Sequence, residues 1–340
     1  MSISCFRQLA SILETESAVL GTVISVKGSV PREVGAKIII CSSDTPSLSS
    51  SGNRSFYTIG GGAGEALVIR QGMTVLETGG KKIVEIDLSG TPQRETQGIC
   101  GGIMQVLLER WSGKQAITLV QEILNKLQSG ENCTLVTPFD INKFSYLLQQ
   151  PKENINNNTN IPNAFVEILQ PPPTLLIIGA GHVGEKLAKF ASILGFEIVI
   201  QDDRPEWANP LRYPEAKVYN QPIVEVINQL ASNKQLYVAL VTRGFDYDLE
   251  ALQVLLQRKI KSKYIGMIGS QKRVRQVYQG IEKIGIEDTN LLKSLLKSIY
   301  APIGLDIGAL TPEEIAVSIC AQLIMIRRGG TGKPLSSIAS

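Results

Sequence analysis

The chain has 340 residues, of which 43% are apolar and 19% charged, and its formal net charge is +3. This length predicts two domains, because a single hydrophobic core stops growing well before it. The small net charge provides no broad basic surface for nucleic acid or an anionic membrane, so partners must be recognised at local sites.

The sequence indicates neither export nor a membrane anchor. Residues 1–16 lack a basic start followed by an apolar core and a small-residue cleavage site, which favours a cytoplasmic protein. The longest apolar run, residues 315–326, is shorter than the roughly 20 residues of a membrane helix and is interpreted as a buried helix.

Strand and helix patterns are mixed in the first half of the chain. In chain order the predicted strands are 18–26, 36–42, 81–88, 103–111 and 133–139, and the predicted helices are 64–80 and 114–130. A Ser-rich stretch, residues 42–55, is interpreted as a mobile loop. The first half is therefore predicted to be an α/β or α+β domain.

Residues 149–163 mark the sharpest change in composition. Asn, Pro and charged residues dominate this stretch and cannot contribute to a core, which predicts an exposed loop near a domain boundary. Three prolines at 171–173 then impose a stiff extended connection. We therefore expect an N-terminal domain over residues 1–170 and a C-terminal domain over 174–340.

A more regular alternation begins at residue 174. Near-continuous apolar strands are predicted at 174–179, 196–202, 236–242 and 263–269, with helices between and after them. Strands buried on both faces that alternate with helices form a parallel sheet. The C-terminal domain is therefore predicted to be a Rossmann-like, doubly wound α/β domain.

The segment GAGHVG, residues 179–184, lies between the first of these strands and its helix. It matches the G-x-G-x-x-G pattern, in which Gly179 permits a tight turn, Gly181 the approach of a diphosphate, and Gly184 close packing of helix on strand. The amides at the start of the following helix attract an anion. We interpret the segment as a nucleotide or related phosphate site, with a Rossmann-like scaffold that holds no dinucleotide as the alternative.

Two residues near this turn bear on the ligand. Asp202 ends the second strand about 20 residues on, where an acid accepts from a ribose hydroxyl, although Arg204 weakens the preference for an unphosphorylated ribose. His182 lies at the helix start, where it either contacts a phosphate or bonds to the backbone of the turn.

Two later segments also have residues suited to an anion. Gly269 and Ser270 follow a strand, and Lys272 and Arg273 lie in the first turn of a helix, where cations oppose the helix dipole and favour an anionic partner over a solvated turn. Asp306 lies between two glycines in a shaped loop, and the sequence leaves it undecided between ligand contact and turn formation.

Three glycine-rich segments of the N-terminal half, 27–37, 58–67 and 98–104, join predicted strands to other elements. Together they would form a surface of exposed amides. The candidate binding residues there are Arg32, Lys37, Gly61, Gly62, Glu65 and Cys100.

Five scattered cysteines without Cys-x-x-Cys spacing indicate reduced thiols and argue against a zinc site. His182 is the only histidine, so a His-rich metal centre cannot be built, nor a Ser-His or Cys-His pair elsewhere. Cys100, with glycines near it, is either an accessible thiolate or a small buried apolar side chain.

These glycine segments, together with "GAGHV", "DDRPEWANP", "YIGMIGS" and "APIGLDIGALTPEEIAVSI", make the chain resemble the xanthine dehydrogenase accessory factor family (XdhC/CoxI) over nearly its whole length. The resemblance implies an N-terminal family domain before the Rossmann domain, and an accessory protein more than a stand-alone enzyme. Such a protein binds the molybdenum cofactor, assists its sulfuration and passes it to a molybdenum hydroxylase. A sulfur donor is a second implied partner, a homodimer stays open, and Cys100 would ligate molybdenum or contact the donor.

Two positions depart from the family pattern: Ala63 stands where some members carry a cysteine, and Arg243 where members commonly carry a histidine. The alternative function is an NAD(P)-dependent oxidoreductase or a nucleotide-binding sensor. The second half offers no recognisable acid or base for hydride transfer.

Overall fold

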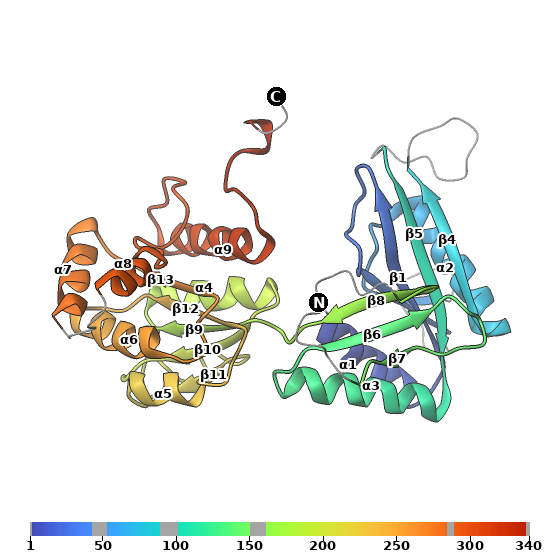
Figure 1. The fold of residues 1–340 in the computed structure, drawn as a ribbon, viewed down its shortest axis with the longest axis horizontal. Helices are drawn as coiled ribbons and strands as arrows, with labels where there is room; N and C mark the ends of the chain where they lie inside the picture. Colours follow the sequence, from blue (N-terminus) through green and yellow to red (C-terminus); the bar gives the residue numbers. More distant parts are fainter. Residues whose placement is uncertain (1, 43–52, 89–100, 150–160, 284–288, 338–340) are drawn as a thin grey trace. The chain divides into compact units, whose positions relative to one another are not determined.

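The computed structural model describes residues 2–42, 53–88, 101–149, 161–283 and 289–337 (Figure 1). The chain forms two compact units, Met1–Pro171 and Pro172–Ser340, and each is described by itself. Most of the predicted loop 149–163 lies outside the described residues, as do residues 43–52. The prediction of a loop over 42–55 is wrong at its end, because the backbone of Asn53–Phe56 pairs with a neighbouring strand.

Two antiparallel sheets build the N-terminal unit. The larger has the strand order β3-β2-β1-β5-β4 and the smaller β7-β6-β8. The strands are β1 (Ala18–Lys27), β2 (Lys37–Ser42), β3 (Asn53–Phe56), β4 (Lys81–Asp87), β5 (Ile103–Trp111), β6 (Cys133–Pro138), β7 (Tyr146–Leu147) and β8 (Ala164–Leu169).

Helices pack on both faces of the larger sheet. Val19 and Leu20 of β1 point to opposite faces, as alternate residues of a strand do. Val19 lies in the core under α2 (Gly62–Thr78). Leu20 lies in the core formed with α1 (Ser2–Leu13) and α3 (Gly113–Gln128). The sequence patterns had not predicted α1, whose apolar residues are buried in that second core.

This unit contains two buried ion pairs, the first between its two sheets and the second within the larger sheet. Lys37 of β2 lies 2.6 Å from Glu167 of β8. Lys81 of β4 lies 2.9 Å from Glu109 of β5. Glu109 also accepts hydrogen bonds from the backbone and hydroxyl of Ser145, next to β7, at 3.1 and 2.5 Å. The charges are therefore paired and hydrogen-bonded, as buried charges must be.

The C-terminal unit is a parallel five-stranded sheet with the strand order β11-β10-β9-β12-β13, which confirms the predicted Rossmann-like α/β fold. Its strands are β9 (Thr174–Ile178), β10 (Glu197–Gln201), β11 (Lys217–Tyr219), β12 (Leu236–Leu240) and β13 (Tyr264–Met267). The order reverses between β9 and β12, and ligands of such sheets bind in the crevice at the carboxyl ends of these strands.

Two helix layers cover this sheet, and Figure 1 shows them on opposite faces. Leu175 and Ile177 of β9 pack with α4 (His182–Ile193) and α9 (Pro312–Arg328). Leu176 and Ile178 pack in a second core formed with α5 (Ile223–Gln229), α6 (Phe245–Gln257), α7 (Gln271–Glu282) and α8 (Thr289–Lys297). A short 3-10 turn, Leu335–Ser337, follows α9.

Helix α9 contains the long apolar run. Its start is a capping box, in which Thr311 accepts from the amide of Glu314 and Glu314 accepts from the amide of Thr311. Ile319 is fully buried, whereas Val317 is 48% exposed, so only one face of this helix is in the core. In the part of the chain that the structure describes, no helix is both long and apolar enough to cross a membrane.

Candidate ligand site

The glycines of residues 179–184 have different roles. Gly179 has a φ of 112°, and a Cβ there would lie 2.5 Å from the carbonyl oxygen of Val241, in the loop after β12. A Cβ at Gly184 would lie 2.1 Å from the carbonyl oxygen of Gly179. Around Gly181, by contrast, no atom lies within 4 Å of such a Cβ. Gly179 and Gly184 therefore permit close packing, and Gly181 presents an open backbone.

The start of α4 is free to receive an anion. Gly181 is its N-cap residue, and a glycine has no side chain that could cap the helix. The amides of a first helical turn have no partner within the helix, so they favour a bound anion. His182 is exposed beside this turn, and its ring lies edge-on to that of Trp207, with centroids 5.4 Å apart.

Asp202 is hydrogen-bonded at both of its carboxylate oxygens. Oδ2 accepts from the amide of Ala180 at 2.8 Å and from Nη2 of Arg204 at 2.9 Å. Oδ1 accepts from the amide and Nε of Arg204 at 3.1 and 2.8 Å. A carboxylate has about four lone-pair sites. While Arg204 stays in place, Asp202 has no acceptor site left for a ribose hydroxyl.

The hydrogen bonds to Asp202 make its contribution to stability dependent on pH. Burial would raise its pKa, but the hydrogen bonds from Arg204 and Ala180 outweigh burial and lower the pKa from 3.8 to about 2. The pKa of Asp202 is lower in the folded state than in the unfolded state. Its contribution to the free energy of unfolding is therefore complete above the unfolded-state pKa and is lost as the pH falls toward 2.

We expect Asp202→Asn to lower the free energy of unfolding by about 2 kcal/mol at pH 6. The difference from the wild-type protein should shrink as the pH falls from about 4 to about 2. Urea unfolding of both proteins at several pH values measures it. A difference that is independent of pH would contradict this role for the carboxylate.

An ion pair closes the crevice between β9 and β12. Arg243, after β12, donates to both carboxylate oxygens of Asp203, each at 2.8 Å. Its guanidinium lies 4.3 Å from the ring centroid of Tyr247. The cavity that remains beside them has a volume of about 20 Å³. That is room for about one water molecule, so an adenosine group does not fit unless Arg243 moves.

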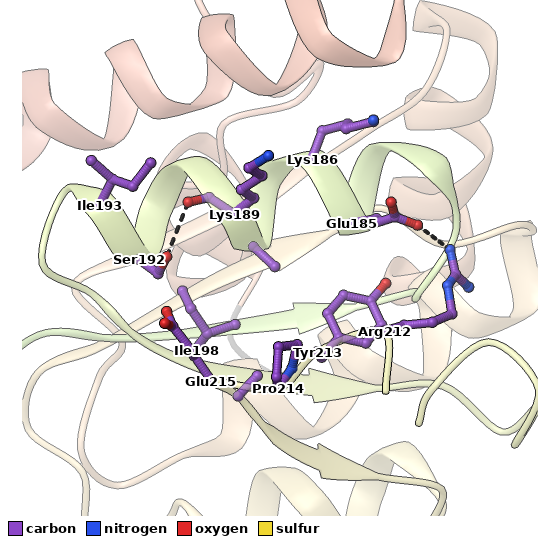
Figure 2. Close-up of a pocket in the computed structure, with 12 residues that line it drawn as sticks. Glu185, Lys186, Lys189, Ser192, Ile193, Ile198, Arg212, Tyr213, Pro214 and Glu215 are labelled. Atoms are coloured by element: carbon purple, nitrogen blue, oxygen red, sulfur yellow. Dashed lines mark hydrogen bonds and ion pairs between the residues drawn. The ribbon is translucent and has the colours of Figure 1, made fainter. Parts of the chain in front are cut away.

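A larger groove runs along α4, and Figure 2 shows the side chains that line it. It has a volume of about 440 Å³ between α4 and residues 212–216. At one end Arg212 pairs with Glu185. Tyr213 and Arg212 also donate to the carbonyl oxygen of Ala180, at 2.9 and 3.4 Å. The groove wall therefore helps to fix the glycine turn.

The second predicted anion site is used largely for internal contacts. Ser270 caps α7 by accepting from the amide of Arg273 at 3.3 Å. Nε of Arg273 donates to Asp248 at 2.7 Å, and Nη2 donates to Thr242 Oγ1 at 2.7 Å. Gly269 adopts a φ of 147° before this helix. Lys272 is exposed.

The loop that carries Asp306 is fixed by α9. The side chain of Gln322 accepts from the amide of Gly304 at 2.9 Å and donates to its carbonyl oxygen at 3.1 Å. Ser318 donates to the carbonyl oxygen of Leu305 at 2.6 Å. Asp306 itself is exposed. These contacts account for the shape of the loop without using the Asp306 carboxylate.

In the N-terminal unit the described parts of the three glycine-rich segments lie side by side. A Cβ at Gly60 would lie 2.2 Å from Pro31, and one at Gly102 would lie 2.3 Å from the carbonyl oxygen of Ser29. Glu65 accepts from Thr58 Oγ1 and from the amides of Ile59 and Gly61, at 2.6, 2.9 and 3.1 Å. Two of the amides expected to be free are therefore bound by Glu65.

The remaining N-terminal candidates lie in different surroundings. Gly61 and Gly62 have positive φ angles of 72° and 68° at the start of α2. The side chain of Lys37 is only 4% exposed and pairs with Glu167, so it serves the packing of the sheets. Arg32 is half-buried, with its Nε 3.9 Å from Glu33. Cys100 lies outside the described residues.

Sequence patterns missed the residues that close the crevice. Arg243 and Asp203 are 40 positions apart, and only the parallel pairing of β12 and β10 with β9 brings them together. Charged residues follow both strands, and the carboxyl ends of parallel strands share one edge of a sheet. The sequence could therefore have predicted that Asp203 and Arg243 lie close together. Among the described residues, no three His, Cys, Asp or Glu side chains form a group that could hold a metal ion.

A parallel sheet with a glycine turn at its switch point defines a Rossmann-domain protein. Residues 175–323 match the XdhC Rossmann domain, and residues 12–87 match the XdhC and CoxI family. The chain therefore belongs to the XdhC and CoxI family, the xanthine dehydrogenase accessory factors.

Two similar proteins agree with this assignment along the whole chain. A probable xanthine dehydrogenase subunit of Bacillus subtilis is 25% identical, over 94% of this chain and 96% of that protein. The crystal structure of a xanthine dehydrogenase from Bacillus halodurans superposes with a TM-score of 0.76, at 25% identity and 99% coverage of both chains. The uncharacterised protein YqeB of Escherichia coli is 27% identical over a region that covers 50% of this chain and 30% of that protein.

Proposed function

We propose that this protein is a cytoplasmic maturation factor that binds the molybdenum cofactor, assists its sulfuration and delivers it to a xanthine dehydrogenase-type hydroxylase. Membership of the accessory factor family supports a maturation role. The client hydroxylase and a sulfur donor are the partners of this proposal. When bound, the cofactor would supply the molybdenum chemistry, and this chain would bind and orient it.

The open start of α4, beside a closed crevice, is the observation that carries the proposal. The first-turn amides after Gly181 have no side-chain cap from that residue, and a Cβ built on Gly181 would meet no neighbouring part of the described protein. These first-turn amides suit the terminal phosphate of a pterin cofactor. The partly exposed guanidinium groups of Arg204 and Arg243 lie next to Asp202 and can add charge-assisted hydrogen bonds.

The same geometry argues against NAD as the ligand of the alternative, an NAD(P)-dependent oxidoreductase or nucleotide sensor; the arginines beside Asp202 would instead attract the 2′-phosphate of NADP. The acceptor sites of Asp202 are taken, and Arg243 occupies the crevice where the adenosine would lie. A dinucleotide would have to displace Arg204 or Arg243. We therefore expect weaker binding of NAD than of the molybdenum cofactor.

A pair of variants at Gly181 tests the phosphate site. Gly181→Asp places a carboxylate at the open helix start and should weaken cofactor binding about tenfold or more, because it repels a phosphate. Gly181→Ala adds only an uncharged methyl group, which contacts no neighbouring part of the protein, and should weaken binding much less than Gly181→Asp does. The measurement is the fluorescent pterin released on oxidation of protein purified from cofactor-producing cells, with a titration of added cofactor and of NAD.

Three results would contradict the proposal. The first is a wild-type protein that is free of pterin and does not bind added cofactor. The second is a Gly181→Asp variant that binds cofactor as well as Gly181→Ala does. The third is micromolar binding of NAD with substrate-dependent turnover, which would favour the oxidoreductase.

The proposed role of Cys100 in handling sulfur predicts selective thiol labelling. The four described cysteines, Cys5, Cys41, Cys133 and Cys320, are buried. Burial raises the pKa of Cys5 and Cys320 to about 12 and that of Cys133 to about 11, so their thiolates are scarce at pH 8. Iodoacetamide should therefore label the native protein at Cys100.

Mass spectrometry of native and urea-unfolded protein measures this labelling. Cys100→Ala should abolish the native reaction and leave four labelled cysteines after unfolding. Native protein that is not labelled at Cys100 would remove the support for a sulfur-handling role.

A further inference from the structure

A basic pocket lies at the amino end of β13, with a volume of about 480 Å³. It is formed by the end of α6, residues 261–265 and the last turns of α8. Because all strands of this sheet are parallel, their amino ends lie at the edge opposite the glycine turn. The pocket is therefore separate from the proposed cofactor site, and its volume is in the range of small-molecule sites.

Three lysines line this pocket: Lys261, Lys263 and Lys297. No Asp or Glu is among its lining residues, all of which the structure describes. Lys261 donates to the carbonyl oxygen of Leu256 at 3.4 Å. None of the three forms an ion pair with another described residue. Three like charges around one cavity repel each other, and an anion bound among them would relieve that repulsion.

The lining also offers hydroxyl groups and an apolar floor. The Oγ atom of Ser262 is buried and has no hydrogen-bond partner in the described part of the chain. Because that atom has almost no exposed surface, a ligand in the cavity does not reach it, and the exposed serines of the lining are Ser294 and Ser298. Leu256, Ile265 and the ring of Tyr300 line the same cavity. These residues suit the apolar or aromatic part of a ligand.

We propose that this pocket binds a small phosphorylated molecule with an apolar or aromatic body. Lys263, just before β13, and Lys297, at the end of α8, contact the phosphate as point charges. The body of the ligand lies against Ile265 and Tyr300. This site does not depend on the molybdenum cofactor or on the glycine turn.

The test uses ADP, inorganic pyrophosphate and adenosine as probes in isothermal titration calorimetry. The Gly181→Asp background weakens the site at α4, so binding that remains there and is lost when the pocket lysines are changed occurs in the pocket. In that background ADP and pyrophosphate should bind and adenosine should bind far more weakly, because the phosphate supplies the attraction. The double variant Lys263→Gln, Lys297→Gln should weaken ADP binding about tenfold or more.

A matched control removes the same charge outside the pocket. Lys259→Gln with Lys293→Gln alters one lysine of each neighbouring segment, and both residues are exposed and absent from the pocket lining. This variant should bind ADP as the background protein does. Equal loss in the two double variants would mean a diffuse charge effect and would overturn the proposal. So would the absence of ADP binding at millimolar concentration in the Gly181→Asp background.

Discussion

Replacing Glu109 with Gln should lower the free energy of unfolding of the N-terminal unit by about 3–5 kcal/mol. The side chains of Lys81 and Glu109 are only 3% and 5% exposed. Without the carboxylate, the ammonium of Lys81 stays buried with no counter-charge. Both carboxylate oxygens of Glu109 accept hydrogen bonds from Ser145 or Trp111. The amide of glutamine has only one oxygen, so it cannot accept all of these bonds.

Urea unfolding followed by tryptophan fluorescence measures this effect. The chain has two tryptophans, Trp111 in the N-terminal unit and Trp207 in the C-terminal unit. In a Trp207→Phe background the signal therefore reports on the unit that contains Glu109. The two units need not unfold together, so each transition must be followed separately.

An exposed ion pair of the same unit provides the control. Glu131 lies 3.7 Å from Lys126, and their side chains are 62% and 46% exposed. Glu131→Gln should change stability by less than about 1 kcal/mol. A loss of similar size in Glu109→Gln and Glu131→Gln would show that burial of the Lys81–Glu109 pair does not matter.

Gly184→Ala should destabilise the Rossmann unit by about 1–3 kcal/mol. The added Cβ would lie 2.1 Å from the carbonyl oxygen of Gly179, and the backbone of the turn cannot yield easily. Gly179 is itself constrained, because its amide donates to the carbonyl oxygen of Gln201 at 2.8 Å. Helix α4 must then move away from β9.

Gly181→Ala is the matched substitution in the same turn. Its Cβ meets no atom within 4 Å, so its stability should differ from that of the wild type by less than about 0.5 kcal/mol. Thermal unfolding in a Trp111→Phe background, followed at Trp207, compares the two variants. If Gly181→Ala were the more destabilising, the packing assigned to Gly184 would be wrong.

These arrangements bear on what the Rossmann unit binds. Asp202 is held by Arg204 and Ala180, and Asp203 by Arg243, so the two acids after β10 face their own arginines. The Arg243–Asp203 pair is partly exposed, and such pairs contribute only about 0–1 kcal/mol. An anion that attracts Arg243 could therefore open the crevice at small cost. The proposed phosphate ligand has this chemistry, whereas an unphosphorylated ribose does not.

The sequence by itself determined the class of the C-terminal fold. Buried apolar strands alternating with helices allow little besides a doubly wound parallel sheet, and each signal lies within one short segment. The turn at residues 179–184 was predictable because its glycine spacing lies within one strand–turn–helix segment. The capping box of Thr311 and Glu314 was predictable because its hydrogen bonds join residues that are close along the chain.

The tertiary structure decided which charges are free. The sequence places Asp202, Lys37 and Glu65 among candidate ligand contacts. In the fold Asp202 is hydrogen-bonded to Arg204 and Lys37 to Glu167. Glu65 accepts hydrogen bonds from the turn before α2. The pairs Arg243–Asp203 and Lys81–Glu109, and the presence of Lys263 and Lys297 around one cavity, depend on contacts between different strands and helices. Local patterns specify elements and short-range pairs such as Asp202–Arg204, whereas pairs between elements form only when those elements pack, and a buried charge must then be paired.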